Sequence, residues 1–213
     1  MNINRAVVFF HSVLIGASSA AFGQAIISIN GDSGPWESQH AGINSVFFYG
    51  TGDEAPPSIV SSIDGQQIQP GEQIQIAYLN GGVSAGAGWP YLDAAGNPEF
   101  AENNSEDNSG NVWPSYYMPS TSYPVYSMEL VATFADAGGD IVGMPFPVGM
   151  SSIDTVPAGA SQLQLGFNDS LYSDNSGSMT VQVSTVPEPS SYVGLLGFGL
   201  LLLRHRHTAA AKI

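Results

Sequence analysis

The sequence predicts an all-β protein built as a β-sandwich, for three reasons. Short alternating runs recur, turn residues separate them, and no internal segment has the periodicity of an amphipathic helix. The alternation is clear where Ile74, Ile76 and Tyr78 alternate with polar or small residues. A period of two predicts half-buried strands, which two sheets packed face to face would cover. Six strands are expected, at residues 25–29, 45–49, 73–79, 127–134, 162–167 and 178–184.

Clusters of Gly, Pro, Asn, Asp and Ser between these runs predict the turns. They are Asp64-Gly65, Pro70-Gly71, Asn80-Gly81-Gly82, Gly138-Gly139, Pro157-Ala158-Gly159 and Ser176-Gly177. Residues 80–124 form one long irregular loop with little strand pattern, and loops of this length are usually functional or disordered. The acidic stretch 99–110 is suited to solvent. The aromatic residues at 89–91 and 113–117 predict that both flanks of this loop fold back.

The charge distribution excludes several classes of function. The chain has a formal charge of −14, yet residues 24–186 hold no Lys or Arg and 17 of the 18 acidic residues. Such a domain has nothing to offset phosphate repulsion, so no nucleic-acid partner is expected. The chain lacks Cys, and His40 is the one histidine in this stretch, which excludes thiolate and multi-histidine sites. Carboxylates, amides and hydroxyls remain, and these are the ligands calcium prefers. An acidic surface is equally typical of adaptation to salt.

The N-terminus has the pattern of a secretory signal peptide. Arg5 precedes an apolar run at 6–21, and Ala21-Phe22-Gly23 provides small residues for cleavage. We therefore expect residues 1–23 to be a signal peptide, with the domain itself at 24–185.

The C-terminus carries a second targeting pattern. Pro187, Glu188 and Pro189 precede an apolar run at 192–203, and the basic residues Arg204 and Arg206 follow. In this order the three parts resemble the PEP-CTERM sorting signal, here residues 186–207 with a tail at 208–213. The resemblance implies export in a Gram-negative bacterium, processing by a membrane exosortase, and a final place at the cell surface or in the extracellular matrix.

The length of this apolar run predicts transient anchoring in the inner membrane. Twelve helical residues span about 18 Å, whereas a hydrocarbon core is about 30 Å thick. Arg204 and Arg206 would hold the cytoplasmic side by the positive-inside rule.

The loop at residues 168–177 is the candidate chemical site. Asp169, Asp174 and Asn175 offer side-chain oxygens within seven positions. Calcium takes about six to eight oxygens from carboxylates, amides and the main chain. Asp, Asn, Ser and Gly are also ordinary turn residues. Two hypotheses therefore stay open for this loop, a calcium site and a solvated connection between strands.

A resemblance to a second family bears on this loop. Residues 157–160, 165–169 and 174–181 resemble the end of the PA-IL-type calcium-dependent galactose-binding lectins, and residues 69–76 resemble their Pro-Gly turn and first core strand. The likeness spans 66–183. It implies a jelly-roll-like, galactose-binding sandwich, with calcium held by an Asp, two adjacent Asn side chains and two main-chain carbonyls, and with sugar hydroxyls completing the shell.

Carried over by position, the resemblance assigns three side chains to the calcium. Asp169 matches the Asp of the lectins, Asp174 stands at the first Asn, and Asn175 matches the second. The loop is two residues shorter than in the lectins, so the main-chain ligand is Leu171 or Tyr172, and we favour Tyr172. The other main-chain ligand should come from residues 80–91.

The three tryptophans, Trp36, Trp89 and Trp113, are candidates either for stacking on a sugar or for packing over the core. We favour Trp89 for stacking, because its loop should border the calcium.

Three functions are compatible with these features. The leading hypothesis is a non-enzymatic, calcium-assisted module that binds an extracellular polysaccharide or a galactose-like sugar. The second is a structural matrix protein in which calcium only stabilises a loop. The third is a glycan hydrolase that uses paired carboxylates, although no nucleophile motif is present.

Overall fold

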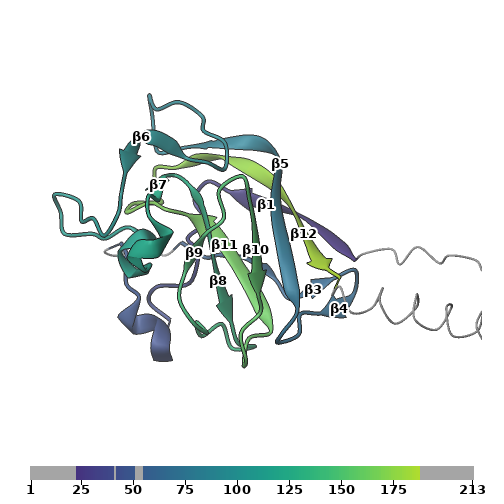
Figure 1. Cartoon of the computed structure of the whole chain (residues 1–213). Helices are drawn as coiled ribbons and strands as arrows, with labels where there is room; N and C mark the ends of the chain where they lie inside the picture. The colour runs from purple at the N-terminus through teal and green to yellow at the C-terminus, as the bar shows by residue number, and fades with distance from the viewer. Residues whose placement is uncertain (1–22, 41, 51–54, 188–213) are drawn as a thin grey trace, which may run out of the picture.

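A computed structural model describes residues 23–40, 42–50 and 55–187, and shows two antiparallel sheets packed face to face (Figure 1). Residues 1–22 of the predicted signal peptide, and the sorting signal beyond Pro187, lie outside the described residues. The predicted all-β sandwich is confirmed. Its strands are β1 (Gln24–Asn30), β2 (Ser58–Val60), β3 (Ser62–Ile63), β4 (Gln66–Gln67), β5 (Gln73–Ser84), β6 (Asn97–Ala101), β7 (Tyr126–Ser127), β8 (Leu130–Ala135), β9 (Phe146–Pro147), β10 (Ser151–Thr155), β11 (Gln162–Phe167) and β12 (Ser176–Val186). Three short 3-10 helices accompany them, η1 (Gly42–Val46), η2 (Pro114–Tyr117) and η3 (Ser120–Ser122).

The strands form two four-stranded sheets. Sheet A has the order β1-β12-β5-β10, and sheet B has the order β2-β11-β8-β9. Two further two-stranded sheets lie at opposite ends of the sandwich, β3–β4 near the start of β1 and β6–β7 at the far end (Figure 1). Within the described ranges, no helix is long and apolar enough to cross a membrane.

The core lies between the two sheets and is built from alternate residues of the central strands. Its fully buried members include Ile74, Ile76, Leu130, Ala132, Leu163, Leu165, Phe167, Met179, Val181 and Val183. Burying one such aliphatic side chain contributes about 1.5–3 kcal/mol. The alternation that predicted β5 and β12 is therefore confirmed in the side chains that face inward.

Strand β11 is buried on both faces, so the expectation of a half-buried strand at 162–167 is wrong. Residues 31–40 and 42–50, the covering segment, lie over its outer face. The backbone N–H of Phe167 donates to the carbonyl of Ser33 at 3.1 Å, and Gly34 crosses directly over Gly166. The polar side chains of β11 are also satisfied within the protein, because Gln162 and Gln164 donate to the carbonyls of Asp136 and Gly139 in the connection between β8 and β9.

Residues 45–49 are not a strand, contrary to the sequence prediction. Ser45 and Val46 belong to η1. Phe47 and Tyr49 pack their rings against Trp36. Trp36 is fully buried and donates its indole N–H to the carbonyl of Phe47 at 2.6 Å. The aromatic residues that suggested a strand are buried here from an irregular segment that covers sheet B.

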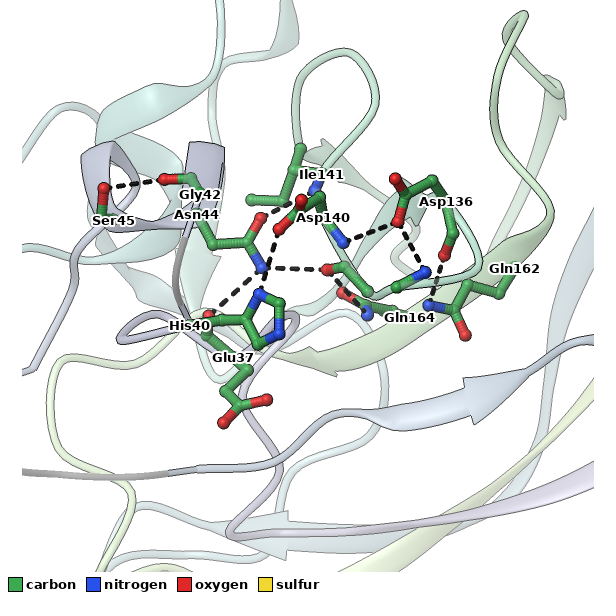
Figure 2. Close-up of polar contacts among 12 residues, drawn as sticks. Glu37, His40, Gly42, Asn44, Ser45, Asp136, Asp140, Ile141, Gln162 and Gln164 are labelled. Atoms are coloured by element: carbon green, nitrogen blue, oxygen red, sulfur yellow. Dashed lines mark hydrogen bonds and ion pairs between the residues drawn. The ribbon is translucent and has the colours of Figure 1, made fainter.

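Asn44 holds this covering segment in place, as Figure 2 shows. Its buried amide donates to the carbonyl of Gly139 at 2.9 Å, and its Oδ1 accepts from the backbone N–H of Ile141 at 2.7 Å. Beside it, His40 Nδ1 lies 3.0 Å from Asp140 Oδ1. These contacts join η1 to the connection between β8 and β9.

Two predicted turns are interior positions of strands. Asn80-Gly81-Gly82 lies within β5, and Ser176-Gly177 opens β12, with Gly82 opposite Ser178 in the register. The ladder is irregular between Thr180 and Val181, and Gly81 has a φ of +98°. Glycines here allow β5 to continue through a bulge to Ser84, rather than to turn back.

Glu129, immediately before β8, is a buried carboxyl group that makes stability depend on pH. It is 8 % exposed, and its Oε2 accepts a hydrogen bond from the backbone N–H of Tyr126 at 2.8 Å. Burial raises the pKa of Glu129 from 4.5 to about 7, and the Tyr126 hydrogen bond opposes the rise. The native state therefore holds this proton more tightly than the unfolded chain does.

The stabilisation from this proton is fully present below about pH 4.5 and is lost as the pH rises through about 7. We expect Glu129→Gln, which stays neutral, to have a free energy of unfolding about 1–2 kcal/mol higher than that of the wild type at pH 8. At pH 4.5 the two proteins should differ little. Urea unfolding at both pH values measures this, with the exposed Glu99→Gln as the control. Equal stability of the wild type and Glu129→Gln at pH 8 would contradict it.

Candidate metal and ligand site

The loop between β11 and β12 lies at the end of the sandwich where β6 and β7 pair. Asn168, at the start of this loop, is fully buried. Its backbone N–H donates to the carbonyl of Glu129, and its own carbonyl accepts from Met128. Its side-chain Oδ1 accepts from the backbone N–H of Ser115 at 2.9 Å, while Nδ2 donates to the carbonyl of Tyr126 at 3.1 Å. Asn168 thereby joins the long loop to sheet B.

Asp169 is a buried carboxylate with one unpaired oxygen. It is 7 % exposed, and its Oδ1 accepts from the backbone N–H of Ser170 at 2.7 Å. Its Oδ2 is buried without a hydrogen-bond partner. Burial raises the pKa of Asp169 to about 6, and the negative charge of Asp174 adds to the rise, whereas Asn175 and the Ser170 N–H lower it. An unpaired buried carboxylate oxygen is costly unless a ligand or a cation completes it.

The structure brings Asn175 and Asp174 close to Asp169. Asn175 donates its Nδ2 to the carbonyl of Gly31 at 3.1 Å, which leaves its Oδ1 buried and without a partner. Asp174 is exposed, and its Oδ2 would lie 2.7 Å from a Cβ placed on Gly86. The segment 80–91, expected to border the site, therefore reaches it at Gly86.

Tyr172 supports the loop between β11 and β12 through its buried side chain and its backbone. Its ring is buried against Tyr49, and its hydroxyl donates to the carbonyl of Phe167 at 2.7 Å. Its carbonyl accepts from the backbone N–H of Asn175 at 3.1 Å, which closes a turn. The role of this carbonyl as a metal ligand stays a prediction.

One observation indicates that the oxygen atoms of this loop suit a calcium ion. Two buried side-chain oxygens, Asp169 Oδ2 and Asn175 Oδ1, belong to one loop and have no hydrogen-bond partner. Both are of the carboxylate or amide type that calcium prefers. In the described part of the chain no group of three or more His, Cys, Asp or Glu forms a metal cluster. A site here would therefore combine two carboxylates, one amide and main-chain or ligand oxygens.

A pocket of about 200 Å³ opens beside Asp169. Three aromatic side chains line it, Trp89, Phe100 and Trp113, and the rings of Trp89 and Phe100 meet edge to face at 5.7 Å. The other lining residues are Ala85, Leu92, Asn97, Glu102, Ser127, Met128 and Asp169. The long loop and β6 thus supply most of the wall.

The tryptophans have different places. Trp89, the residue favoured for stacking, is 49 % exposed at this pocket. Trp113 is half-buried in the same wall, and its Nε1–H is buried without a partner. Trp36 lies in the covering segment with its side chain fully buried, so stacking on a sugar is ruled out for it.

Phe100 and Glu102 were missed as pocket residues, because the stretch 99–110 was expected to face solvent. Phe100 sits on β6 and Glu102 follows it. The available signal was Phe100 itself, an aromatic residue within an otherwise polar stretch.

His40 has a carboxylate partner but no nucleophile. Its ring meets Asp140 at 3.0 Å, and in Figure 2 the Glu37 carboxylate points away from this pair. No serine or threonine hydroxyl among the described residues hydrogen-bonds to the His40 ring. The pair therefore joins two surface segments and does not form a catalytic triad.

The fold defines the chain as an all-β sandwich protein, with a candidate site on the loop between β11 and β12. Residues 185–206 match the model of the PEP-CTERM protein-sorting motif, which confirms the sorting signal expected from the sequence and implies export and membrane-associated sorting. Pro187 is exposed at the end of β12, whereas Glu188, Pro189, Arg204 and Arg206 lie outside the described residues. The boundaries at 23 and 185 stay predictions.

A search of curated proteins finds no match to the chain. Several solved structures are similar to it, among them the following two. The N-terminal domain of EclA, described as a PllA-like lectin, is 17 % identical and covers 76 % of this chain and 95 % of its own, with a TM-score of 0.38. AJLec from the sea anemone Anthopleura japonica is 14 % identical and covers 77 % of this chain and 93 % of its own, with a TM-score of 0.34. At these TM-scores neither structure supports a function.

Proposed function

We propose that this protein is an exported, non-enzymatic carbohydrate-binding module assisted by calcium. The observation that carries the proposal is the pair of buried, unpaired oxygens on Asp169 and Asn175, next to a pocket with aromatic walls. A calcium ion would satisfy both oxygens, and the aromatic rings offer flat faces to the C–H groups of a sugar ring.

Each residue has a defined task in this proposal. Asp169, Asp174 and Asn175 hold the ion, with the Tyr172 carbonyl as a further ligand. Bound calcium would supply coordination positions for vicinal hydroxyls of the sugar. Trp89 provides the stacking surface at the mouth of the pocket, and Asn168 keeps the wall attached. A galactose-like sugar or an extracellular polysaccharide is the ligand class expected from the sequence.

Sorting determines where this binding would act. We propose that an exosortase processes the chain near Pro187, after transient anchoring in the inner membrane of a Gram-negative bacterium. The exposure of Pro187 at the end of β12 supports this, because a processing enzyme must reach the segment. The module would then act at the cell surface or in the extracellular matrix.

Calcium titration by calorimetry tests the metal site. The full chain is purified in an uncharged polyoxyethylene detergent, which contains neither a sugar nor an ammonium group. We expect wild-type binding with a dissociation constant of about 10⁻⁴–10⁻³ M, typical of extracellular modules. Asp169→Asn, which preserves the shape but removes the charge, should weaken binding at least about tenfold.

Asp64→Asn is the matched control, since it removes one charge at the β3–β4 end. Asp64 has a φ of +52°, which Asn tolerates well. The control should bind calcium like the wild type. Absence of binding by the wild type at millimolar calcium would refute the metal site. Calcium binding without any retained sugar would favour the structural matrix hypothesis.

A hydrolase is a second candidate, because Glu102 and Asp169 line the same pocket and glycosidases use paired carboxylates. Release of reducing ends from a polysaccharide panel distinguishes the two functions. We expect none, and turnover that is lost in Glu102→Gln would assign catalysis instead.

A further inference from the structure

The pocket beside Asp169 combines aromatic walls with carboxylates. Trp89, Phe100 and Trp113 present three rings, and Glu102 and Asp169 line the same 200 Å³ space. A cation over an aromatic face is attracted by the electrons of the ring, and a carboxylate within reach strengthens the attraction. The composition of this wall therefore suits a positively charged group.

Glu102 has no cation of the protein to pair with. Residues 24–186 contain neither Lys nor Arg, and the one ion pair of the described residues, His40 with Asp140, belongs to another part of the fold. With calcium bound, the charges of Asp169 and Asp174 would be offset, and Glu102 would remain in the pocket lining without a compensating charge from the protein. A positively charged ligand would supply that charge.

One of the residues that line the pocket also has a hydrogen-bond donor without an acceptor. The Nε1–H of Trp113 is buried without a partner, and an unpaired buried donor costs about 1–3 kcal/mol. A simple alkylamine brings no acceptor for this indole. A sugar carries hydroxyl oxygens that accept hydrogen bonds, so it supplies the acceptor for Trp113 Nε1 that an alkylamine lacks.

The charge of the whole domain points in the same direction. Seventeen acidic residues without a Lys or Arg produce a negative field over residues 24–186. This field repels uronates and sulfated sugars, and it raises the local concentration of cationic ones. Acidic polysaccharides are therefore poor candidates for this pocket.

We propose that the pocket binds an amino sugar through its protonated amine, with the ammonium between Glu102 and the rings of Trp89 and Phe100. The ligand class is a hexosamine with a free amine, alone or within a partly de-acetylated polysaccharide. This inference rests on the proposed carbohydrate binding and adds the class of sugar. Acetylation of the amine removes the positive charge and eliminates the preference.

Binding of a glucosamine trimer and of its tri-N-acetylated counterpart tests this. The full chain in polyoxyethylene detergent is titrated at about pH 6 with saturating calcium, and both calorimetry and tryptophan fluorescence are recorded. We expect the free-amine trimer to bind at least about tenfold more tightly than the acetylated one. Glu102→Gln should remove most of this difference, whereas Asp64→Asn should retain it.

A polyamine with the same number of amines, spermidine, controls for unspecific attraction to an acidic protein. It should bind more weakly than the glucosamine trimer and should not compete at equal concentration. Equal competition by spermidine, or an amine preference that survives in Glu102→Gln, overturns the proposal. Equal binding of the two trimers overturns it and leaves the proposed function intact.

The calcium titration separates the remaining outcomes. If calcium binds and neither trimer does, the amine specificity is refuted, and the retention of a galactose-like sugar then decides the carbohydrate function. If the free-amine trimer binds with the expected preference while calcium does not bind, the pocket is supported and the metal site is refuted.

Discussion

Gly166→Ala should prevent the chain from folding to its native state. A Cβ on Gly166 would overlap the backbone of Gly34 and the nitrogen of Pro35, which cross β11 on the outer face of sheet B. No rotamer change relieves a clash between a Cβ and a neighbouring backbone. We expect a loss of at least about 3 kcal/mol, above the usual range for overpacked cores, and little soluble protein.

The same substitution should also disturb the candidate site. The covering segment includes Gly31, whose carbonyl accepts a hydrogen bond from the Asn175 side chain. Moving the segment away from β11 therefore removes the support of Asn175, one of the proposed calcium ligands. Calcium affinity of any soluble Gly166→Ala protein should fall with its stability.

Urea unfolding and soluble yield measure the effect, with Gly138→Ala as the control. Gly138 lies in a surface turn, where the nearest atom to a Cβ is Asp136 Oδ1 at 3.2 Å, the end of a flexible side chain. The control should stay within about 1 kcal/mol of the wild type. A Gly166→Ala protein as stable as the control would show that the crossing segment is not packed as described.

The outcome for Gly166 also shows how far the fold could be predicted. The alternation of 162–167 identified the strand with correct bounds, and the runs near 25–29, 73–79 and 178–184 identified three more. Periodicity reports which residues differ in polarity along a strand. It does not report that another segment lies over the polar face, because this depends on contacts such as Gly34 with Gly166, 132 positions apart.

Short edge strands were missed for a related reason. Strand β2 has three residues and β9 has two, so neither is long enough to show a period. Strand β10 alternates, but with Ser152 and Asp154 on the inward side. Inward-pointing polar groups at a sheet edge oppose edge-to-edge association, and they also hide the strand from a search for apolar alternation.

The candidate site was predictable where its residues are neighbours in the chain. Asp169, Asp174 and Asn175 lie on one loop, and a loop that turns back brings them together. The pocket wall could not be predicted in the same way. Phe100 and Glu102 reach the pocket because β6 pairs with β7, and nothing local to 97–102 indicates that pairing.

Asn168→Ala should uncouple this wall from the sandwich. The amide is fully buried and makes two hydrogen bonds across the chain, to the N–H of Ser115 and to the carbonyl of Tyr126. Each group left unpaired costs about 1–3 kcal/mol, so we expect a loss of about 2–4 kcal/mol in the free energy of unfolding. The exposed Asn80→Ala on β5 is the control and should stay within about 0.5 kcal/mol.

Asn168→Ala should also affect the pocket, because Ser115 and Tyr126, the two hydrogen-bond partners of the amide, belong to segments that carry its wall. Ser115 lies in η2, which begins directly after Trp113. Tyr126 belongs to β7, which pairs with β6, the strand that carries Phe100. Without the Asn168 amide, both parts of the wall lose their attachment to the loop between β11 and β12. Amide hydrogen exchange at Ser115 should accelerate at least about tenfold, and the emission of the exposed Trp89 should lose its response to ligand.

These two readouts separate a local from a global effect of Asn168→Ala. Faster exchange confined to residues near Ser115, at a temperature where the β11 amides stay protected, would establish that the wall opens on its own. Uniformly faster exchange would mean that the amide supports the whole sandwich and that the pocket has no independent motion. Unchanged exchange at Ser115 together with wild-type stability would contradict the hydrogen bonds themselves, since a buried N–H that loses its acceptor cannot stay protected at no cost.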